Sequence, residues 1–481
     1  MKRIKLLIFL ILISLTGCGR EEPVNLPPPA SPPPTTSTGV RTSFAEVVDK
    51  VSPAVVTIRT ESRLRAPQQF PFMDDPFFRR FFGDRLPQTP EQLRRGLGSG
   101  VIVSTDGYIL TNHHVIDGAQ QIEVELREQR TVEAKLIGSD PPSDLAVLKI
   151  GQAGLSALAL ADSDKVQVGD VVLAIGNPLG IGQTVTMGII SAKSRRTGLS
   201  NGSFEDFLQT DAPTNRGNSG GALVDSSGNL VGINSQILSP SGGSIGIGFA
   251  IPSNMARDVL DQLVKNGKVR RGQLGIVVQS VTAEIASSLG LSSPRGVIVS
   301  QIQPGSAAER AGLKQGDVIL ALNGNPVSQP NSFRNDIAAT PPGQTVTLRI
   351  WRNGNEEELR PTLSEFTSDE RRGGSSENGS SESRGSDDGR LGLSVQPLTP
   401  ALAQELGLRS DTQGLAVMEV DPLGPAADVG IRQGDVIEQV NRQPVRSVAE
   451  LRAAIDRSGN KPLLLLLNHR GTTVFVTVRP R

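Results

Sequence analysis

The chain of 481 residues contains a single cysteine, Cys18, so no disulfide can form within it, and a zinc site built on several cysteines is excluded. Tryptophan and tyrosine occur once each, and only three histidines are present. Basic and acidic residues both number 49, so the net charge is zero and no broad basic field favours nucleic acid. The sequence has no Gly-x-x-x-x-Gly-Lys motif, which disfavours ATP-driven chemistry. We therefore expect no cofactor, no metal and no nucleic-acid partner.

The N-terminus has the pattern of an export signal. Basic residues precede an apolar run from Leu6 to Leu15, which is too short to span a bilayer by itself. Leu15-Thr16-Gly17-Cys18 then resembles a bacterial lipobox. This resemblance implies cleavage before Cys18 and acylation of its thiol, and each buried CH₂ of the acyl chains contributes about 0.8 kcal/mol to membrane binding. An ordinary cleaved signal with a chance cysteine is the alternative.

The loop Gly217-Asn218-Ser219-Gly220-Gly221 supplies the candidate nucleophile, Ser219. Glycines allow backbone N–H groups to converge on one point, which a developing oxyanion requires. Serine is a poor nucleophile until a base removes its proton, so the fold must bring a histidine to it. The alternative for this loop, taken alone, is a simple turn.

Two of the three histidines lie side by side in Thr111-Asn112-His113-His114-Val115, and Asp144 opens a strand-like segment further along the chain. Asp144 can orient an imidazole, and the order His, Asp, Ser is that of the chymotrypsin-type arrangement. Asp140 is a rival, but it precedes two prolines and fits a turn better. Strand alternation makes neighbouring residues face opposite ways, so only one histidine can point into a cleft. A metal site at the two histidines is disfavoured, because no carboxylate–histidine spacing accompanies them.

Short β-type runs alternate with turn residues from Gly98 to Pro252, which predicts a barrel or a sandwich. The runs that stand out are 100–103, 121–126, 131–137, 145–150, 171–175, 184–190 and 230–234. Helices are predicted on either side, from a capping box that begins at Ser43 and from an apolar stripe in Ser253 to Asn266. Ser62 to Arg95 shows no periodicity, which predicts a long loop.

The C-terminal half contains two related units. Gly312-Leu313-Lys314-Gln315-Gly316-Asp317-Val318-Ile319 is followed 118 residues later by Gly430-Ile431-Arg432-Gln433-Gly434-Asp435-Val436-Ile437, which indicates an internal duplication. The segment between the units, from Ser364 to Gly389, is rich in serine, glycine and glutamate and predicts a flexible linker. A Pro-rich stretch from Glu21 to Thr38 similarly predicts an extended tether.

Together, the Thr-Asn-His-His-Val, Asp-Leu-Ala-Val and Gly-Asn-Ser-Gly-Gly motifs and the two repeats resemble the HtrA/Deg family of bacterial serine proteases with tandem PDZ domains. The resemblance implies a mainly β fold, with a chymotrypsin-like double β-barrel protease domain followed by two α+β PDZ domains. PDZ domains bind extended peptides by adding a strand to a sheet edge. The implied division is a signal peptide (1–17), a tether (18–41), the protease domain (42–267), a first PDZ domain (268–365), a linker (366–388) and a second PDZ domain (389–481).

The resemblance also implies which residues carry the chemistry. His114, Asp144 and Ser219 are expected to form a catalytic triad, because the base in this family stands directly before a valine. The oxyanion hole is expected at Gly217, Asn218 and Ser219, with the N–H groups of the first and the last as donors.

Further binding residues follow from the same resemblance. Ile237 is expected to line an apolar specificity pocket for small aliphatic side chains, with plain β-core packing as the alternative. Leu274, Gly275 and Ile276 resemble the loop with which a PDZ domain captures a C-terminal carboxylate through backbone N–H groups. The second copy, Leu391-Gly392-Leu393, lacks the preceding Arg-Gly pair, which leaves peptide binding by that repeat open.

Six of the fourteen phenylalanines lie between Phe70 and Phe82, and an apolar patch of this size needs a partner. The resemblance implies a regulatory loop that reaches a neighbouring subunit of a homotrimer or a higher multiple. Packing of the loop against its own barrel is the alternative.

The implied function is an ATP-independent serine endopeptidase that degrades misfolded or damaged envelope proteins, with PDZ domains that bind unfolded chains and peptides with apolar C-termini. The implied location is the periplasmic side of the bacterial envelope, with a membrane anchor at Cys18. Gly19, in place of an aspartate, favours the outer membrane. The alternative function is a chaperone or scaffold that binds unfolded chains, with proteolysis secondary. The triad motifs are all present, which disfavours a purely non-enzymatic role.

Overall fold

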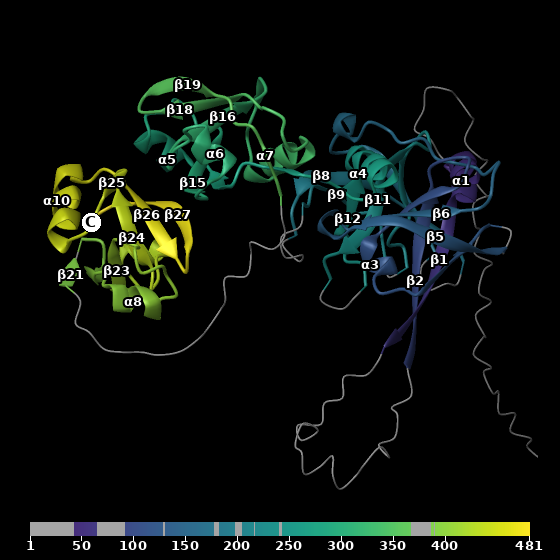
Figure 1. Ribbon diagram of the computed structural model, residues 1–481, viewed down its shortest axis with the longest axis horizontal. Helices are drawn as coiled ribbons and strands as arrows, with labels where there is room; N and C mark the ends of the chain where they lie inside the picture. The colour runs from purple at the N-terminus through teal and green to yellow at the C-terminus, as the bar shows by residue number, and fades with distance from the viewer. Residues whose placement is uncertain are drawn as a thin grey trace, which may run out of the picture. The chain divides into compact units, whose positions relative to one another are not determined.

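The computed structural model describes residues 43–64, 92–127, 130–177, 182–197, 204–215, 217–239, 243–366, 386–388 and 390–481 (Figure 1). The predictions for the signal peptide, the tether, Cys18 and the loop from Phe70 to Phe82 lie outside these ranges. Ala45–Arg481 forms one compact unit. Within the described ranges, no helix is both long enough and apolar enough to cross a membrane.

Six antiparallel strands close into a first barrel, in the order β1-β2-β3-β6-β5-β4. They are β1 Val55–Leu64, β2 Gln92–Ile102, β3 Tyr108–Thr111, β4 Gln121–Glu125, β5 Thr131–Asp140 and β6 Leu145–Ile150. The helix α1 (Ala45–Val51) precedes them, as the sequence predicted. Alternation along the strands places apolar side chains in the barrel interior, where Ile58, Leu110 and Leu148 are fully buried.

The first two strands are longer than the sequence predicted. β1 continues to Leu64 and β2 starts at Gln92, so the prediction of a loop from 62 to 95 was wrong at both of its ends. Glu61 and Arg95 are direct partners across the strand pair, and their side chains form an ion pair with 3.1 Å between the charged atoms. An antiparallel ladder is stabilised by such cross-strand pairs and by its backbone bonds, so it continues without an apolar pattern.

A second barrel closes in the order β10-β11-β12-β9-β8-β7. Its strands are β7 Val171–Gly176, β8 Thr184–Arg195, β9 Phe207–Thr210, β10 Ala222–Asp225, β11 Leu230–Ile237 and β12 Gly248–Pro252. The predicted helix α4 (Ser253–Asn266) follows and ends at Gly267, which has a φ of 69°. The apolar face of α4 packs on β5 and β6 of the first barrel and on β11 and β12 of the second. Leu263 of this face contacts β5 at Gly138, where a Cβ atom would lie 3.0 Å from the leucine.

The first repeat forms a small sheet in the order β14-β15-β16-β18-β19, flanked by helices. Its elements are β13 Gly272–Gln273, β14 Ile276–Ser280, α5 Ala283–Ser288, β15 Val297–Ile302, α6 Ala307–Arg310, β16 Val318–Leu322, β17 Asn325–Pro326, α7 Pro330–Ala339, β18 Leu348–Arg352, β19 Asn355–Leu359 and β20 Ser364–Glu365. β13 pairs with β20, which brings the two ends of the repeat together. The core of the repeat gathers apolar residues from the sheet and from α7, among them Val299, Ile319 and Phe333.

From β22 to β27, the second repeat has the same order of strands and helices as the first has from β14 to β19, as the duplication predicted. Its elements are β21 Ser386–Asp388, β22 Leu393–Pro397, α8 Pro400–Glu405, β23 Leu415–Val420, α9 Pro425–Asp428, β24 Val436–Val440, β25 Gln443–Pro444, α10 Val448–Ser458, β26 Leu463–His469 and β27 Thr472–Val478. The sheet order is β21-β22-β23-β24-β26-β27. Three residues of the predicted linker, Ser386–Asp388, thus form a strand of this sheet.

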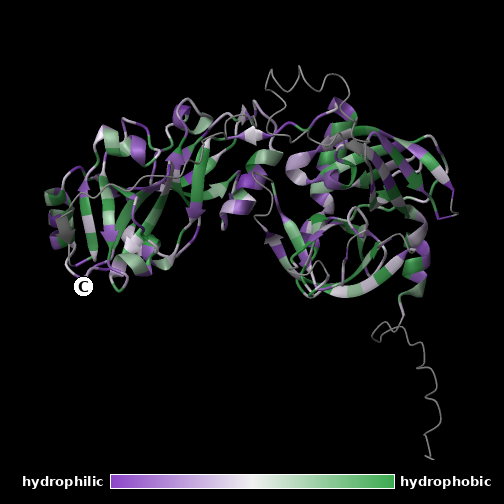
Figure 2. Cartoon of the chain, turned by 90° about the horizontal axis from the view of Figure 1, so that it is seen from below, coloured by the Kyte–Doolittle hydropathy of each residue, from purple (hydrophilic) through white to green (hydrophobic). Residues whose placement is uncertain are grey.

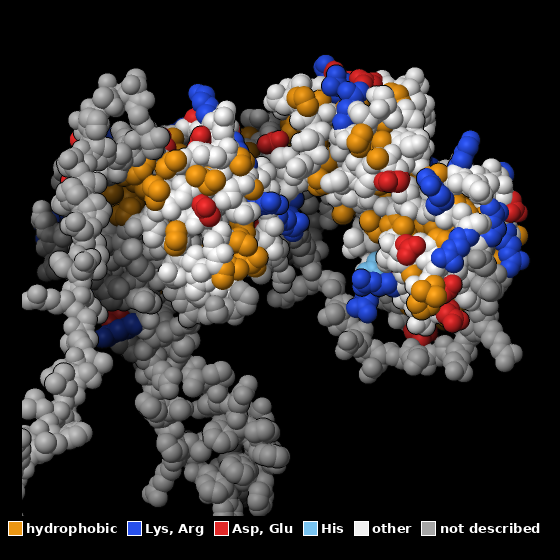
Figure 3. Space-filling model, turned by 180° about the vertical axis from the view of Figure 1, so that it is seen from behind, with side chains coloured by type: hydrophobic (Ala, Val, Ile, Leu, Met, Phe, Trp, Pro, Cys, Tyr) orange, Lys and Arg blue, Asp and Glu red, His pale blue; other side chains and the backbone are white. Residues whose placement is uncertain are grey.

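Hydrophobic and hydrophilic residues alternate along some strands (Figure 2), among them β4, whereas β16 and most of β26 are buried throughout. This period of two is typical of strands that bury one face. On the face seen in Figure 3, basic and acidic side chains both occur on each described part of the surface, in keeping with a net charge of zero.

Candidate active site

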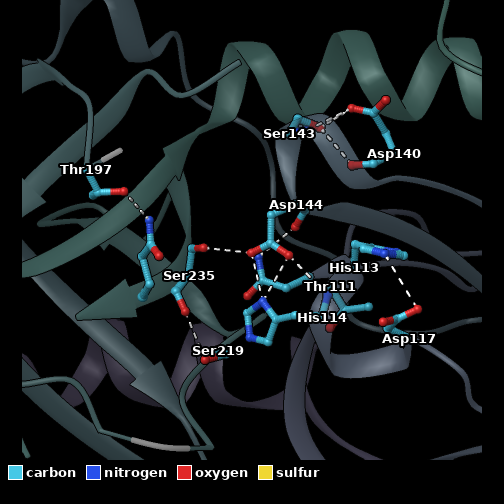
Figure 4. A network of polar contacts seen from close by, with 12 residues as sticks. Thr111, His113, His114, Asp117, Asp140, Ser143, Asp144, Thr197, Ser219 and Ser235 are labelled. Atoms are coloured by element: carbon cyan, nitrogen blue, oxygen red, sulfur yellow. Dashed lines mark hydrogen bonds and ion pairs between the residues drawn. The ribbon is translucent and has the colours of Figure 1, made fainter. Parts of the chain in front are cut away.

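The imidazole of His114 is presented by a single helical turn. β3 ends two residues before α3 (His113–Ile116) begins, so the expectation that the two histidines alternate on a strand was wrong. Successive residues on a helix point roughly 100° apart, which still separates the two rings. His113 turns toward Asp117, with 3.8 Å between Nε2 and the carboxylate, whereas His114 turns toward Asp144 (Figure 4).

Asp144 is fixed by several hydrogen bonds. Its two carboxylate oxygens lie 2.9 and 2.8 Å from His114 Nδ1. The backbone N–H of His114 and the hydroxyl of Ser235 also donate to the carboxylate, at 3.0 and 2.8 Å. Asn112 and the N–H of His113 donate to the backbone carbonyl of Asp144. With Nδ1–H directed at Asp144, Nε2 is the ring nitrogen that can take up a proton.

These bonds hold Asp144 in an uncommon backbone conformation. It follows a short 3-10 turn, Pro141–Ser143, and has a φ of 56°. A left-handed conformation costs a residue with a Cβ atom about 1–2 kcal/mol. The donors around the carboxylate and the carbonyl offset this cost, so the backbone conformation and the direction of the carboxylate are set together.

The loop that carries Ser219 requires glycine at position 220. Gly220 has a φ of 82°, and a Cβ atom there would lie 2.1 Å from the carbonyl oxygen of Ser99. The loop packs directly on β2, since the N–H of Ser99 donates to the carbonyl of Ser219 at 2.8 Å. The hydroxyl of Ser99 donates to the carbonyl of Gly217 at 2.6 Å. The first barrel therefore positions the nucleophile loop of the second barrel.

The hydroxyl of Ser219 donates to the backbone carbonyl of Ser235, at 2.9 Å, in this structure. Ser235 thus contacts both ends of the candidate triad, because its own hydroxyl donates to Asp144. In Figure 4, the second ring nitrogen of His114 points to the side on which Ser219 lies. The sequence did not indicate Ser235, because it lies in a polar run, Asn234-Ser235-Gln236, and its burial appears only in the structure.

The three residues expected at the oxyanion hole differ in what their N–H groups do. The N–H of Asn218 donates to the carbonyl of Asn215 within the loop, at 3.0 Å. That bond holds the loop and directs this donor away from a substrate. Gly217, which has a φ of 101°, precedes Asn218 in the turn, and Ser219 follows it. Asn218 and Ser219 both line the cavity described next.

A cavity of about 580 Å³ contains the candidate triad. His114, Asp144 and Ser219 all line it, and so does Ile237 at the end of β11. Apart from Asp144 and the two histidines, no titratable side chain lines the part of this cavity that the structure describes. A basic substrate side chain bound beside Ile237 would therefore find no carboxylate placed specifically to pair with it.

Comparison with known proteins agrees with this geometry. The trypsin-like peptidase domain family matches residues 98–233, and the PDZ domain family matches residues 272–363 and 417–468. The periplasmic pH-dependent serine endoprotease DegQ of Escherichia coli is 44% identical over 431 residues, which cover 88% of each chain. The chain belongs to the HtrA/Deg family of serine endoproteases. A probable periplasmic DegP-like endoprotease of Brucella suis is 40% identical over 95% of this chain and 92% of its own.

Solved structures agree with the family assignment. The HtrA-type protease AlgW with a tripeptide has a TM-score of 0.56 and 44% identity, over 68% of this chain and 98% of its own. AlgW with a decapeptide has a TM-score of 0.54 and 48% identity, over 68% and 99%. The predicted double-barrel protease domain followed by PDZ domains is confirmed, and so is the prediction of a serine endopeptidase. The relatives are named as endoproteases, so the chaperone alternative is not favoured.

The first PDZ domain of this HtrA-family protease has a cavity of about 600 Å³ between β14 and α7. Leu274, Gly275 and Ile276 all line it. Gly275 has a φ of 74°, and a Cβ atom there would lie 2.4 Å from Ser306. The carbonyls of Leu274 and Gly275 accept hydrogen bonds from Ala308 and Gln303, which fixes the shape of the loop.

Asp140, the rival candidate in the sequence, pairs with Arg271, which directly precedes this PDZ domain's first strand. The two guanidinium nitrogens lie 2.6 and 2.5 Å from the carboxylate oxygens, and both side chains are at least nine-tenths buried. Asp140 also accepts from the N–H of Ser143 in the turn before Asp144. It therefore has the predicted turn role, and its ion pair joins that turn to the start of the PDZ domain.

The carboxylates of Asp206, which is half-buried, and Asp336, which is exposed on α7, are close enough for their charges to interact. Burial raises the pKa of Asp206, and burial and the negative charge of Asp206 raise the pKa of Asp336 on α7. One carboxylate oxygen of Asp206 is buried without a hydrogen-bond partner among the described residues. Asn331 and Asn335 of the same helix donate to the carbonyl of Glu205, at 2.7 and 2.9 Å. These bonds hold α7 beside Asp206 despite the cost of the two charges.

Proposed function

We propose that Ser219 is the nucleophile of this endopeptidase, His114 its general base and Asp144 the residue that orients the base. The observation that carries the proposal is the carboxylate of Asp144 at 2.8 Å from His114 Nδ1, inside the cavity that Ser219 lines. Asp144 selects the tautomer in which Nε2 accepts the proton and stabilises the imidazolium that results. Because the fold holds these three groups in place, proton transfer and attack on a bound substrate take place within one complex and need no further collision.

The reaction begins when the hydroxyl of Ser219 turns from the carbonyl of Ser235 toward His114. Breaking that hydrogen bond costs about 1 kcal/mol, which substrate binding readily supplies. Ser219 Oγ attacks the peptide carbonyl carbon while Nε2 takes its proton, and the N–H groups of Gly217 and Ser219 receive the negative oxygen. His114 then gives the proton to the leaving amine, and water, activated by the same imidazole, hydrolyses the acyl-enzyme.

The substrates are extended or misfolded proteins of the envelope. Two observations support this proposal. The sequence has no phosphate-binding motif, which favours chains that are already unfolded. The cavity that Ile237 lines has, in its described part, no titratable side chain besides Asp144 and the two histidines, which favours small aliphatic substrate side chains. Leu274, Gly275 and Ile276 of the first PDZ domain receive apolar peptide C-termini, and AlgW, a similar protease, has been solved with peptides. The relatives' names support a periplasmic location. We also propose that the chain is anchored to the membrane through an acylated Cys18 and that it assembles as a homotrimer.

Covalent labelling tests the proposed nucleophile. A fluorophosphonate should label the wild-type chain at one residue, and Ser219→Ala should abolish labelling. Ser227→Ala, in the exposed turn between β10 and β11, is the matched control and should label normally. Unchanged labelling of Ser219→Ala would refute the assignment. Digestion of folded and unfolded casein, with the cut sites mapped by mass spectrometry, should show cleavage of the unfolded form after small aliphatic residues.

A further inference from the structure

The two PDZ domains differ at the sheet edge that binds peptides in this type of domain. β14 of the first domain and β22 of the second follow equivalent Leu-Gly loops, at Leu274-Gly275 and Leu391-Gly392. In both strands the pairing register shifts after the second residue, between Val277 and Val278 and between Ser394 and Val395. The edge strands β14 and β22 therefore correspond residue by residue. A difference in whether the edge is free or paired must come from the chain segments that lie beside it.

The edge of the first domain is open. Among the strands that the structure describes, β14 pairs with β15 alone, and the cavity of about 600 Å³ runs along its other side. The chain that enters this domain is held elsewhere, because β13 pairs with β20 and Arg271 pairs with Asp140. An extended peptide can therefore add to β14 without displacing any described strand.

The edge of the second domain is occupied by the chain itself. β21 pairs antiparallel with β22, with Ser386 opposite Val395, Asp387 opposite Ser394 and Asp388 opposite Leu393. A peptide captured by its C-terminal carboxylate would run antiparallel to β22 and end beside the Leu-Gly loop. β21 runs in this direction and ends at that loop, so its backbone has the position and polarity of a bound peptide.

Arg390 fixes the chain immediately after this strand. Its guanidinium lies 3.2 Å from Asp456 and 3.1 Å from the carbonyl of Gly459, at the C-terminal end of α10. A cation is favourable at that end of a helix. The corresponding residue of the first domain, Gln273, contacts Gln303 instead. The second domain thus has its own anchor for the chain that continues from β21.

We propose that Ser386–Asp388 is a built-in occupant of the peptide-binding edge of the second PDZ domain. The resting chain then offers one site for peptides with a free C-terminus, in the first domain. A second site appears only when β21 is displaced from β22. Because β21 is tethered, its effective concentration at this edge is on the order of millimolar, so weakly binding peptides do not displace it. This inference concerns peptide recognition and does not depend on which residue attacks the substrate.

Cysteine crosslinking tests the position of the strand in the full-length chain. With Cys18→Ser, the pair Asp387→Cys and Ser394→Cys provides two thiols on directly opposed residues. Direct partners in an antiparallel pair have Cα atoms about 4.5–5.5 Å apart, which a disulfide can bridge. Asp387→Cys with Gln396→Cys is the matched control, since its positions are two residues out of register. Mild oxidation should crosslink the first pair nearly completely and the control many-fold more slowly. Equal rates, or no crosslink in the first pair, would overturn the proposal.

Peptide titration tests the predicted number of peptide-binding sites. The full chain carrying Ser219→Ala should bind one equivalent of a labelled peptide with an apolar C-terminus, measured by calorimetry. Ser386→Pro with Asp387→Pro should raise the stoichiometry to two, because consecutive prolines remove at least one N–H that faces β22. Ser380→Pro with Ser381→Pro, further upstream, is the control and should leave one site. Two sites in the parent chain, or one in the Ser386→Pro/Asp387→Pro chain, would refute the proposal. Loss of all binding with normal crosslinking would instead refute the peptide site of the first domain.

Discussion

Ser235→Ala tests how far the orientation of Asp144 limits catalysis. The change removes the hydroxyl that lies 2.8 Å from the carboxylate and leaves the backbone carbonyl that accepts from Ser219. A hydrogen bond to a charged group contributes about 1.5–3 kcal/mol. The Asp144 side chain is 25% exposed, so water can replace part of the loss, and the lower end of this range applies. A loss of about 1.5 kcal/mol from the transition state corresponds to a roughly tenfold lower kcat/KM.

The assay is cleavage of an unfolded fluorogenic substrate, with the melting temperature measured in parallel. Ser235→Ala should lower kcat more than it changes KM, because the hydroxyl acts through Asp144 rather than on the substrate. Ser239→Ala, which changes another serine that lines the same cavity, is the matched control and should keep kcat near the wild-type value. Wild-type kcat in Ser235→Ala, with an unchanged melting temperature, would refute the reasoning.

Three further outcomes are expected. Asp206→Asn should raise the melting temperature at pH 7, by about 2–4 °C for each 1 kcal/mol gained in the free energy of unfolding. The pKa of Asp206 is raised in the folded protein, so the wild-type protein loses stability as the pH rises through that pKa, and the gain in the variant should shrink in acid. A gain in melting temperature that stays constant across pH would contradict this. Gly220→Ala should lower the free energy of unfolding by about 2 kcal/mol or more and abolish fluorophosphonate labelling, because its Cβ atom would lie 2.1 Å from the Ser99 carbonyl in β2. Normal labelling of this variant would contradict the prediction. Asp140→Asn should lower the free energy of unfolding, measured with denaturant, by about 3–5 kcal/mol, because Arg271 stays buried and unpaired. Adding Arg271→Met should recover part of this loss. Strictly additive losses in the double variant would argue against an interaction between the two residues.

The sequence was sufficient where the chemistry requires one residue type. Gly220 must be glycine because backbone from another strand lies against it, so the loop around Ser219 is visible as a motif. The duplicated block around Gly316 and Gly434 is visible for a similar reason: both glycines have a φ near 90°, at 88° and 89°. Such positions are fixed by local backbone geometry, and local geometry is what a sequence pattern records.

The sequence was insufficient where neighbours in space decide the structure. The turn α3 is too short to show a helical period, so the two histidines were assigned to a strand. Ser235 acts through partners from two other loops, and nothing near it in sequence indicates them. Ser386–Asp388 has the composition of a flexible linker, and it becomes a strand because β22 offers an unpaired edge beside it.

The packing of α4 has a consequence for how this enzyme is inactivated. His114 and Asp144 belong to the first barrel and Ser219 to the second, so the chemistry depends on the distance between two separately closed bodies. α4 packs on both barrels and so adds to the hydrogen bonds between Ser99 and the Ser219 loop. A substitution on the apolar face of α4 would therefore loosen the two barrels relative to each other while each stayed folded. Such a molecule would keep its spectroscopic signature of β structure and still cleave nothing.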